Sequence, residues 1–392
     1  MSGPENTGKP ATLGKDGSLS KLGTQEKAGA QEGVGAPERA RTQDGAGASA
    51  GGAEELPGLD LGRFRTYLDE QRPGLRAGEL TAELIAGGRS NLTYSVSDGV
   101  HDWVLRRPPL GHVLATAHDM GREYRVITAL RDTAVPVPTT VLLCTDPGVL
   151  GAPFYLMDRT PGQVLRTRSD AAWLRPEQAR ALSLELVEVL ADLHAVAPES
   201  VGLTDFGRPD GFLTRQVNRW KKQLDASRSR ELAGIDDLHA QLGARIPVSG
   251  EPAIVHGDYR LGNVLVGADP LGITGVLDWE MSTLGDPLTD LGLLVVYNHD
   301  LGTAGEEISG SNSVPGLAGT DELIAHYAQR SGHDVGRLNW YVALSFFKLA
   351  VIVEGIHFRF VAGQTVGAGF DKIGKLTPLL VSSGLNALAE ES

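Results

Sequence analysis

The sequence predicts an α+β fold in which a smaller, strand-rich region precedes a larger, mainly helical region. The first observation behind this prediction is a set of short runs between residues 80 and 157 that are rich in β-branched and aromatic residues. The second is a series of long segments from residue 176 onward, with apolar residues at helical spacing. The third is size, because 392 residues with 41% hydrophobic content suit one two-lobed fold plus an extension.

Composition excludes several classes of protein. The net charge of −13 argues against nucleic-acid binding, which needs a basic face. Cys144 is the only cysteine, so no internal disulfide forms, in keeping with a reducing compartment. No run of eighteen uninterrupted apolar residues predicts a membrane span, and the first ten residues lack the apolar core of a secretory signal. We therefore expect a cytoplasmic protein.

The N-terminal segment, residues 1–58, is predicted to be a disordered tail. Residues 1–55 are rich in Gly, Ala, Ser, Gln and Glu and contain no aromatic residue. Such a segment buries too little apolar surface to offset the entropy lost on ordering. A targeting or partner-binding role is the alternative to a passive solvated tail.

The strand-rich region is predicted to span residues 59–158. A helix over Leu59–Gln71 is expected to end at Pro73-Gly74. Pro108-Pro109 stops the strand over residues 103–107, which leaves Arg107 as a solvent-facing residue. The other elements expected in this region are strands on both sides of residues 87–91, a helix over His118–Leu130, and strands over Val141–Cys144 and Phe154–Met157.

The helical region is predicted to span residues 159–392. Its first long helix starts at Pro176, because proline is favoured in the first helical turn. The apolar stripe of this helix is expected to be core. The helices expected in this region cover residues 176–196, 212–226, 231–242, 288–298, 321–331, 338–361 and 376–388.

Residues 254–290 carry the motif around which the chain is organised. Val264–Val266 and Ile273–Leu277 are apolar runs separated by Gly267, Asp269-Pro270 and Gly272, which predicts a β-hairpin. An antiparallel hairpin brings the start of its first strand beside the end of its second. We therefore expect Asn263 and Asp278 to meet at one mouth of the hairpin, with Asp258 on the loop just before it.

Oxygen-bearing side chains that converge in this way suit Mg²⁺, which also shares substrate phosphates. The spacing H-x-D-x-x-x-x-N from His256, followed by a second Asp, matches the catalytic-loop and metal-Asp pattern of protein kinases. In that scheme Asp258 accepts the proton of the attacking hydroxyl, and Asn263 and Asp278 hold Mg²⁺. The plainer interpretation is that the three residues only cap turns; their order on one hairpin favours the functional one.

The segments HGDYRLGN, LDWE and GDPLTDLG resemble the aminoglycoside phosphotransferase and choline kinase-like family, small-molecule kinases with a protein kinase-like fold. The nearest resemblance is to the kinase-like domains associated with acyl-CoA dehydrogenases. Family features run from about Leu61 to Leu388. The resemblance implies a bilobal fold with a small β-rich N-lobe and a larger helical C-lobe. It also implies ATP, or another nucleoside triphosphate, and Mg²⁺ as cofactors.

The same resemblance suggests residues that contact the nucleotide phosphates. Gly88, Ser90 and Asn91 lie where the family has the loop that covers the phosphates; a plain turn is the alternative. Arg106 takes the position of the kinase lysine, and arginine and lysine are not interchangeable. Glu123 is its expected partner, unless it is an ordinary helix-surface residue.

Further residues take roles by position alone. Met157 and Asp158 are expected on the adenine side, at the junction of the lobes. Glu280 is a candidate to assist a second Mg²⁺ or its waters. His256 is expected to brace the catalytic loop, and Asp290 to hold that loop through backbone hydrogen bonds.

The resemblance leads to an expected reaction, the transfer of the γ-phosphate of ATP to a hydroxyl of a small molecule. The acceptor classes that stay open are antibiotics, amino alcohols, sugars and hydroxyacyl compounds. A nucleotide-binding pseudokinase that regulates a partner is the alternative, since Arg106 replaces the usual lysine. A third hypothesis is an accessory protein of an acyl-CoA dehydrogenase pathway. The oligomeric state is open.

Overall fold

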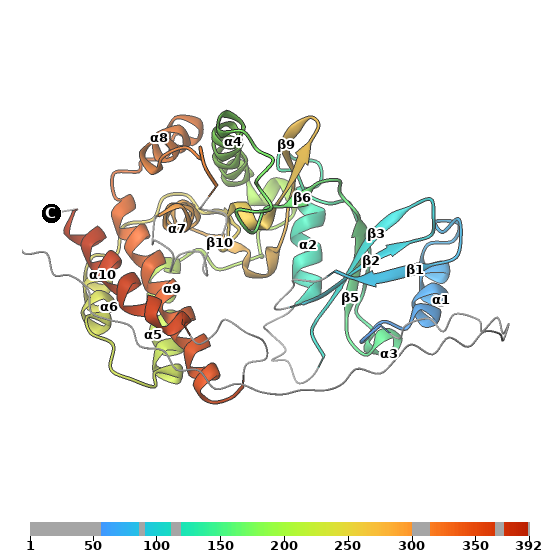
Figure 1. The fold of residues 1–392 in the computed structure, drawn as a ribbon, viewed down its shortest axis with the longest axis horizontal. Coiled ribbons are helices and arrows are strands. Elements are labelled where there is room, and N and C mark those ends of the chain that lie inside the picture. Colours follow the sequence, from blue (N-terminus) through green and yellow to red (C-terminus); the bar gives the residue numbers. More distant parts are fainter. Residues whose placement is uncertain (1–55, 86–90, 111–118, 300–313, 365–371, 391–392) are drawn as a thin grey trace, which may run out of the picture. The chain divides into compact units, whose positions relative to one another are not determined.

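The computed structural model describes residues 56–85, 91–110, 119–299, 314–364 and 372–390. Nearly all of the predicted tail lies outside these ranges, as do Gly88 and Ser90 of the expected phosphate-covering loop. The described residues form a strand-rich lobe, from α1 to β5, and a helical lobe, from β6 to α10 (Figure 1).

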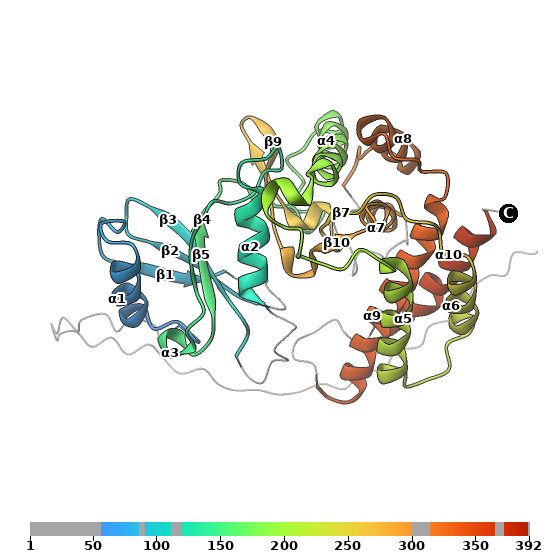
Figure 2. The same ribbon diagram turned by 180° about the vertical axis from the view of Figure 1, so that it is seen from behind.

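The strand-rich lobe is built on an antiparallel five-stranded sheet of order β1-β2-β3-β5-β4. Its strands are β1 (Thr81–Leu84), β2 (Leu92–Ser97), β3 (Asp102–Arg107), β4 (Thr140–Cys144) and β5 (Phe154–Asp158). Its helices are α1 (Leu61–Gln71), α2 (Met120–Leu130) and α3 (Pro147–Leu150). Figures 1 and 2 show α1 and α2 on opposite faces of the sheet.

The two faces of the sheet bury different apolar clusters. On the α1 side, Phe64 and Leu68 of that helix pack with Trp103, Leu105 and other sheet residues. On the α2 side, residues such as Val126 and Ile127 join the large core that continues into the helical lobe. Helix α2 therefore links the sheet to the helical lobe.

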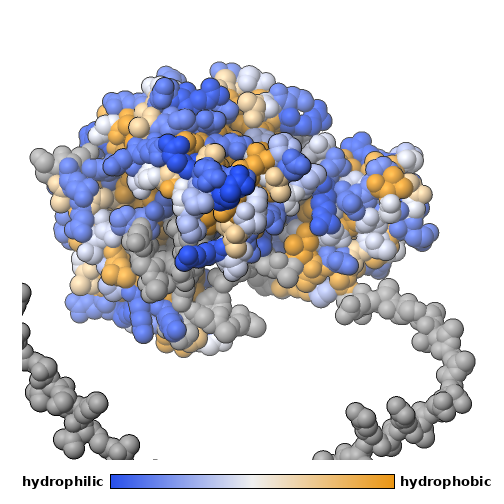
Figure 3. All heavy atoms as spheres, turned by 45° about the horizontal axis from the view of Figure 1, so that its top comes forward, coloured by the Kyte–Doolittle hydropathy of each residue, from blue (hydrophilic) through white to orange (hydrophobic). Residues whose placement is uncertain are grey.

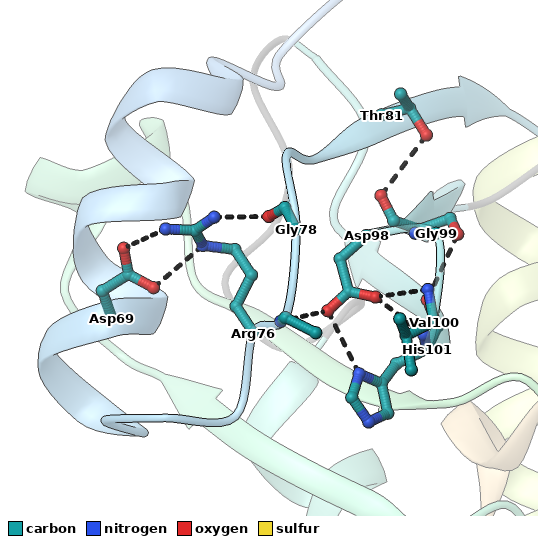
Figure 4. A network of polar contacts seen from close by, with 10 residues as sticks. Asp69, Arg76, Gly78, Thr81, Asp98, Gly99, Val100 and His101 are labelled. Carbon is teal, nitrogen blue, oxygen red and sulfur yellow. Dashed lines mark hydrogen bonds and ion pairs between the residues drawn. The ribbon is translucent and has the colours of Figure 1, made fainter.

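Asp98 holds the turn between β2 and β3 against the segment that leads into β1 (Figure 4). One carboxylate oxygen accepts from the backbone N–H of Val100 (2.9 Å) and of His101 (2.7 Å), and the other accepts from Ala77 N–H (2.7 Å). Burial opposes the charge of Asp98, but these backbone donors outweigh it and lower its pKa below the ordinary value. Nearby, Arg76 forms a two-pronged ion pair with Asp69 (3.0 and 2.9 Å).

The expectation that Arg107 faces solvent is wrong. Alternation along β3 puts Arg107 on the same face as Trp103 and Leu105, where it is 4% exposed. Its guanidinium donates to the carbonyl oxygens of Leu150 (2.8 Å) and Gly58. Arg107 therefore ties the start of the lobe to α3, while Arg106 points to the opposite face.

The helical lobe is centred on α9, which contacts α5, α6, α7 and α10. Its helices are α4 (Pro176–Ala195), α5 (Phe212–Ser227), α6 (Ile235–Ala244), α7 (Leu288–Asn298), α8 (Thr320–Ser331), α9 (Leu338–Val361) and α10 (Leu376–Ala389). Its strands are β6 (Gln163–Val164), β7 (Ala253–Val255), β8 (Val264–Ala268), β9 (Leu271–Val276) and β10 (Thr283–Gly285). They form a β6-β8-β9 sheet and a β10-β7 pair.

Helix α9 is the one helix in the described ranges that is long and apolar enough, by length and composition, to cross a membrane. However, 67% of its most apolar stretch is buried inside the lobe, as in the core helix of a folded domain. On the face shown in Figure 3, the described hydrophobic residues lie among hydrophilic ones.

The sequence located the long elements within a few residues and missed three short ones. The predicted helices over 288–298 and 338–361 match α7 and α9 at both ends. The missed elements are the four-residue helix α3 and the strands β6 and β10, which have two and three residues. Strands of that length carry no alternation to detect, because they are defined by their partners β8 and β7. The limits proposed for the tail and lobes stay predictions.

Candidate active site

Asp258 lies on the loop between β7 and β8, and both of its carboxylate oxygens are held by neighbouring side chains. Oδ1 accepts from the Tyr297 hydroxyl (2.5 Å) and Oδ2 accepts from Asn263 Nδ2 (3.0 Å). Asn263 Nδ2 also donates to the backbone carbonyl of Asp258 (2.8 Å). The carboxylate, 22% exposed, is thus fixed in orientation while it still reaches solvent.

The hairpin forms as predicted and brings the two ends of its strands together. Val264 of β8 pairs with Val276 of β9, and Leu277 N–H donates to the carbonyl oxygen of Asn263 (2.8 Å). Asp278 follows directly, with a φ of 67°. A left-handed backbone is uncommon for residues other than glycine, and such strain is concentrated at functional sites. Here it turns the chain out of β9 at Asp278.

Two further residues brace the loop that carries Asp258. The buried carboxylate of Asp290, on α7, accepts from the backbone N–H of His256 (2.6 Å) and of Gly257 (2.8 Å). His256 donates from Nε2 to Leu277 O (2.8 Å) and accepts the Asp258 N–H at Nδ1 (3.2 Å). Gly257 has a φ of 84°, and a Cβ there would come within 2.8 Å of Met281 O. The bracing predicted for Asp290 and His256 is therefore the geometry observed.

Arg106 connects the strand-rich lobe to the hairpin. Its Nη1 lies 3.2 Å from Glu123 Oε1 on α2, and its Nη2 lies 3.1 Å from Asp278 Oδ1. Burial works against the charge of Arg106, but Glu123, Tyr155 and Asp278 together raise its pKa above the ordinary value. The expected Arg106–Glu123 contact thus exists, and Glu123 is a buried residue rather than a surface one.

The remaining predicted residues are placed as follows. Asn91 is 4% exposed and donates from Nδ2 to Glu280 Oε2 (3.3 Å), which joins the end of the expected phosphate-covering loop to the segment after Asp278. Met157 is buried at the end of β5, and Asp158 beside it is exposed. The roles predicted for these residues stay predictions.

Sequence reasoning missed three features that the fold brings to this loop. Tyr297 contacts Asp258 from α7, and Lys348 of α9 donates from Nζ to Gly257 O (2.6 Å). Several arginines of α5 and of the loop before it surround a cavity beside the same loop. Lys348 and the arginines lie far from the motif in sequence; Tyr297 lies only seven residues after Asp290, but no spacing rule assigns its hydroxyl to Asp258.

We expect Tyr297→Phe to lower kcat about tenfold with little change in KM for the nucleotide, because a hydrogen bond to an ionised group contributes about 1.5–3 kcal/mol. Burial raises the pKa of Tyr297 well above its ordinary value, so the phenol donates and helps to orient Asp258. Steady-state kinetics measure the effect. Tyr341→Phe is the matched control, since it removes a phenol–carboxylate bond to Asp286 (2.8 Å). Equal kcat in the two variants would contradict the role of Tyr297 in orienting Asp258.

The fold and the site together define a class of protein. An antiparallel sheet with an ion-paired helix, joined to a helical lobe that carries an Asp–Asn–Asp hairpin, is the architecture of kinase-like phosphotransferases. The model of the phosphotransferase enzyme family, APH, matches residues 81–334, so the chain belongs to that family.

The curated relatives that cover most of this chain are named as acyl-CoA dehydrogenases. Acyl-CoA dehydrogenase family member 11 of Rattus norvegicus is 34% identical over 317 residues, which cover 78% of this chain and 40% of the relative. Acyl-CoA dehydrogenase family member 10 of Mus musculus is 33% identical over 295 residues, which cover 74% of this chain and 27% of the relative. The chain thus spans less than half the length of these relatives.

Solved structures share the bilobal, protein kinase-like fold. A protein of Ralstonia eutropha JMP134, provisionally assigned as an aminoglycoside phosphotransferase, has a TM-score of 0.74 and 32% identity, over 84% of this chain and 98% of that one. Plasmodium vivax ethanolamine kinase has a TM-score of 0.53 and 14% identity, over 84% of this chain and 87% of that one. An aminoglycoside phosphotransferase in complex with AMP-PNP and hygromycin B has a TM-score of 0.54 and 16% identity, over 83% of this chain and 98% of that one. The last two show the fold alone.

Proposed function

We propose that this protein transfers the γ-phosphate of ATP to a hydroxyl group of a small molecule, with Mg²⁺ as the metal. The observation that carries the proposal is the fixed carboxylate of Asp258, beside Asn263 and near the strained Asp278 at the hairpin mouth. Family membership supports a phosphotransferase activity in general. The acceptor and the use of ATP are our inference.

The donor set at the hairpin mouth fits Mg²⁺. Both described hydrogen bonds of the Asn263 amide come from Nδ2, which leaves its carbonyl oxygen for a metal. Asp278 uses Oδ1 for Arg106, and its side chain is 32% exposed. Among the described residues no group of three His, Cys, Asp or Glu side chains could hold a metal. Oxygen atoms of the nucleotide phosphates would complete the coordination shell of the metal, as is usual for Mg²⁺.

The protein's own residues would act by position and charge. Asp258 accepts the proton of the acceptor hydroxyl as the oxygen–phosphorus bond forms and the bond from the γ-phosphorus to the bridging oxygen breaks. Asn263 and Tyr297 keep that carboxylate aimed, and Asp290 keeps its loop in place. Bound Mg²⁺ would neutralise charge on the phosphates. Arg106, held by Glu123, would supply a second positive charge to them.

A nucleotide-binding pseudokinase is the second candidate, favoured by one observation. Arg106 stands in place of lysine and pairs with Asp278, the residue expected to hold the metal. In that role the protein would bind nucleotide and regulate a partner without transferring phosphate. The names of the curated relatives make an acyl-CoA dehydrogenase the partner to test first.

The test is consumption of Mg²⁺-ATP by the purified protein with pooled aminoglycosides, macrolides, amino alcohols, sugars, and hydroxyacids or their CoA esters. We expect one pool to give a phosphorylated product, detected by mass spectrometry. We also expect EDTA to stop the reaction, because removal of Mg²⁺ would take away the positive charge that it supplies to the nucleotide phosphates. Nucleotide binding with no product from any pool would contradict transfer to these acceptor classes and favour the pseudokinase.

A further inference from the structure

A cavity of about 520 Å³ lies beside the loop that carries Asp258. Helices α5, α7 and α9 line it together with the start of α2 and the segment after Asp278. Apolar side chains such as Trp220, Leu293 and Leu344 form part of the wall. The rest is unusually basic for a chain with a net charge of −13. The basic lining residues are Arg122, Arg208, Arg215, Arg219 and Lys348.

Two of these five cations, Arg122 and Arg215, each use guanidinium N–H groups on two backbone carbonyl oxygens, which fixes their position in the wall. Arg122 donates to the backbone carbonyl oxygens of Phe206 and Ser282, the latter at 3.1 Å. Arg215 donates to backbone carbonyl oxygens in the turn before α5.

The acidic residues of the lining have hydrogen-bond partners of their own, and the charge of Lys348 is favoured by nearby carboxylates, those of Asp258 and Asp290. Asp119 caps α2 by accepting the Arg122 N–H (3.0 Å), and both oxygens of Asp290 accept backbone N–H groups. Glu280 accepts from the Asn91 amide. In the part of the chain that the structure describes, Arg208 and Arg219 form no ion pair with a carboxylate.

Lys348 places this positive charge next to the candidate base. Its ammonium donates to Gly257 O (2.6 Å), the residue before Asp258, and lies 5.6 Å from the centre of the Trp220 ring. An ammonium has three donor hydrogens, so two remain for a ligand. Burial lowers the pKa of Lys348, and the positive charge of Arg219 lowers it further. The carboxylates of Asp258 and Asp290 act in the opposite direction. An anion in the cavity would relieve this repulsion.

We propose that this cavity is an anion subsite in which Arg208, Arg219 and Lys348 bind a phosphate or carboxylate group of the acceptor. That the bound molecule is the phosphate acceptor rests on the proposed function. The anion subsite itself is defined by the three cations alone. Arginine binds both kinds of anion with paired N–H groups, and lysine binds them as a point charge.

The proposal separates the acceptor classes that the sequence left open. A polycationic aminoglycoside or an amino alcohol would enter a cavity of its own sign, which weakens binding and slows encounter. A hydroxyl compound with a phosphate or carboxylate group would be attracted, with its apolar part against Trp220 and Leu344. The acceptor is therefore anionic, with its hydroxyl directed to Asp258.

The experiment is a calorimetric titration of the full chain with inorganic phosphate and, separately, with acetate, at an ionic strength held constant with NaCl. We expect the parent to bind at least one anion, and Arg219→Gln and Arg208→Gln each to weaken that binding about tenfold or more, because a charged hydrogen bond is lost. Which anion binds more tightly distinguishes phosphate from carboxylate chemistry. Choline, titrated in the same way, should not bind.

Lys222→Gln is the matched control, since it removes one positive charge from the exposed face of α5 outside the cavity. Binding equal to the parent is expected for that variant. Equal binding by Arg219→Gln, no anion binding by the parent, or displacement of the anion by AMP-PNP with Mg²⁺ would each overturn the subsite. The titration needs no turnover, so a protein that binds phosphate here but consumes no ATP would count against the proposed function alone.

Discussion

Asp258→Asn is expected to abolish phosphoryl transfer while nucleotide binding stays unchanged. Asparagine keeps the size of the side chain and its contact distance to Tyr297 and Asn263, but it cannot accept the proton of the acceptor hydroxyl. General-base catalysis contributes about 10²–10⁴-fold, so the rate should fall by at least that lower limit. The rate is measured by product formation with the acceptor found in the pooled assay, and nucleotide affinity by calorimetry.

The control for this prediction is Asp132→Asn, the same chemical change at an exposed carboxylate that pairs with Arg131 at the surface. It should leave the rate at the parent level. Comparable turnover by Asp258→Asn and the parent would remove Asp258 from the reaction. Loss of nucleotide binding together with turnover would instead indicate that the substitution disturbs the loop.

Arg230→Ala should lower the free energy of unfolding by about 3 kcal/mol, near the lower end of the cost of breaking a buried ion pair. Arg230 donates to both carboxylate oxygens of Glu354 on α9 (3.1 and 2.7 Å) and to Gly374 O before α10 (2.5 Å). Glu354 is fully buried, so its charge would be left without a cation, with only the Thr377 hydroxyl still donating to it (3.3 Å). Since the Arg230 side chain is 35% exposed, some water can enter, which limits the loss.

Urea denaturation measures this change. Arg228→Ala is the control in the same loop, because Arg228 pairs with Asp236 at a site where the aspartate side chain is 56% exposed. Surface ion pairs contribute up to about 1 kcal/mol, so this variant should stay within that limit. If the two variants lose the same amount, the buried pair does not hold α9 to α10.

Much of the fold and part of the site could be predicted from the sequence. Asn263 and Asp278 flank one hairpin, whose strand pairing fixes how its two ends meet, and Asp258 lies on the loop just before it. Asp290 could be assigned as the residue that holds the loop because it is near in sequence and opens a helix whose ends are clear. The Arg106–Glu123 contact needed the family resemblance as well, since no local rule joins β3 to α2.

The predictions that failed or were missed concern side chains whose surroundings come from distant segments. Arg107 was expected in solvent because two prolines follow it, but the packing of α3 and residue 58 against the sheet gives its guanidinium buried carbonyl partners. Tyr297 looked like an ordinary apolar residue of α7, since hydrophobic periodicity says only which face is buried. The phenol's partner, Asp258, is known only once α7 is placed.

The sequence by itself determined the class of fold, the hairpin and the identity of the candidate base and metal ligands, because these depend on spacing within about forty residues or less and on local backbone pairing. The tertiary structure alone decided what surrounds the base. Arg208, Arg219 and Lys348 come from separate segments, and only the packing of α5 and α9 against the catalytic loop directs their charges into one cavity. Electrostatic attraction of a ligand depends on that convergence in space, which no linear spacing records.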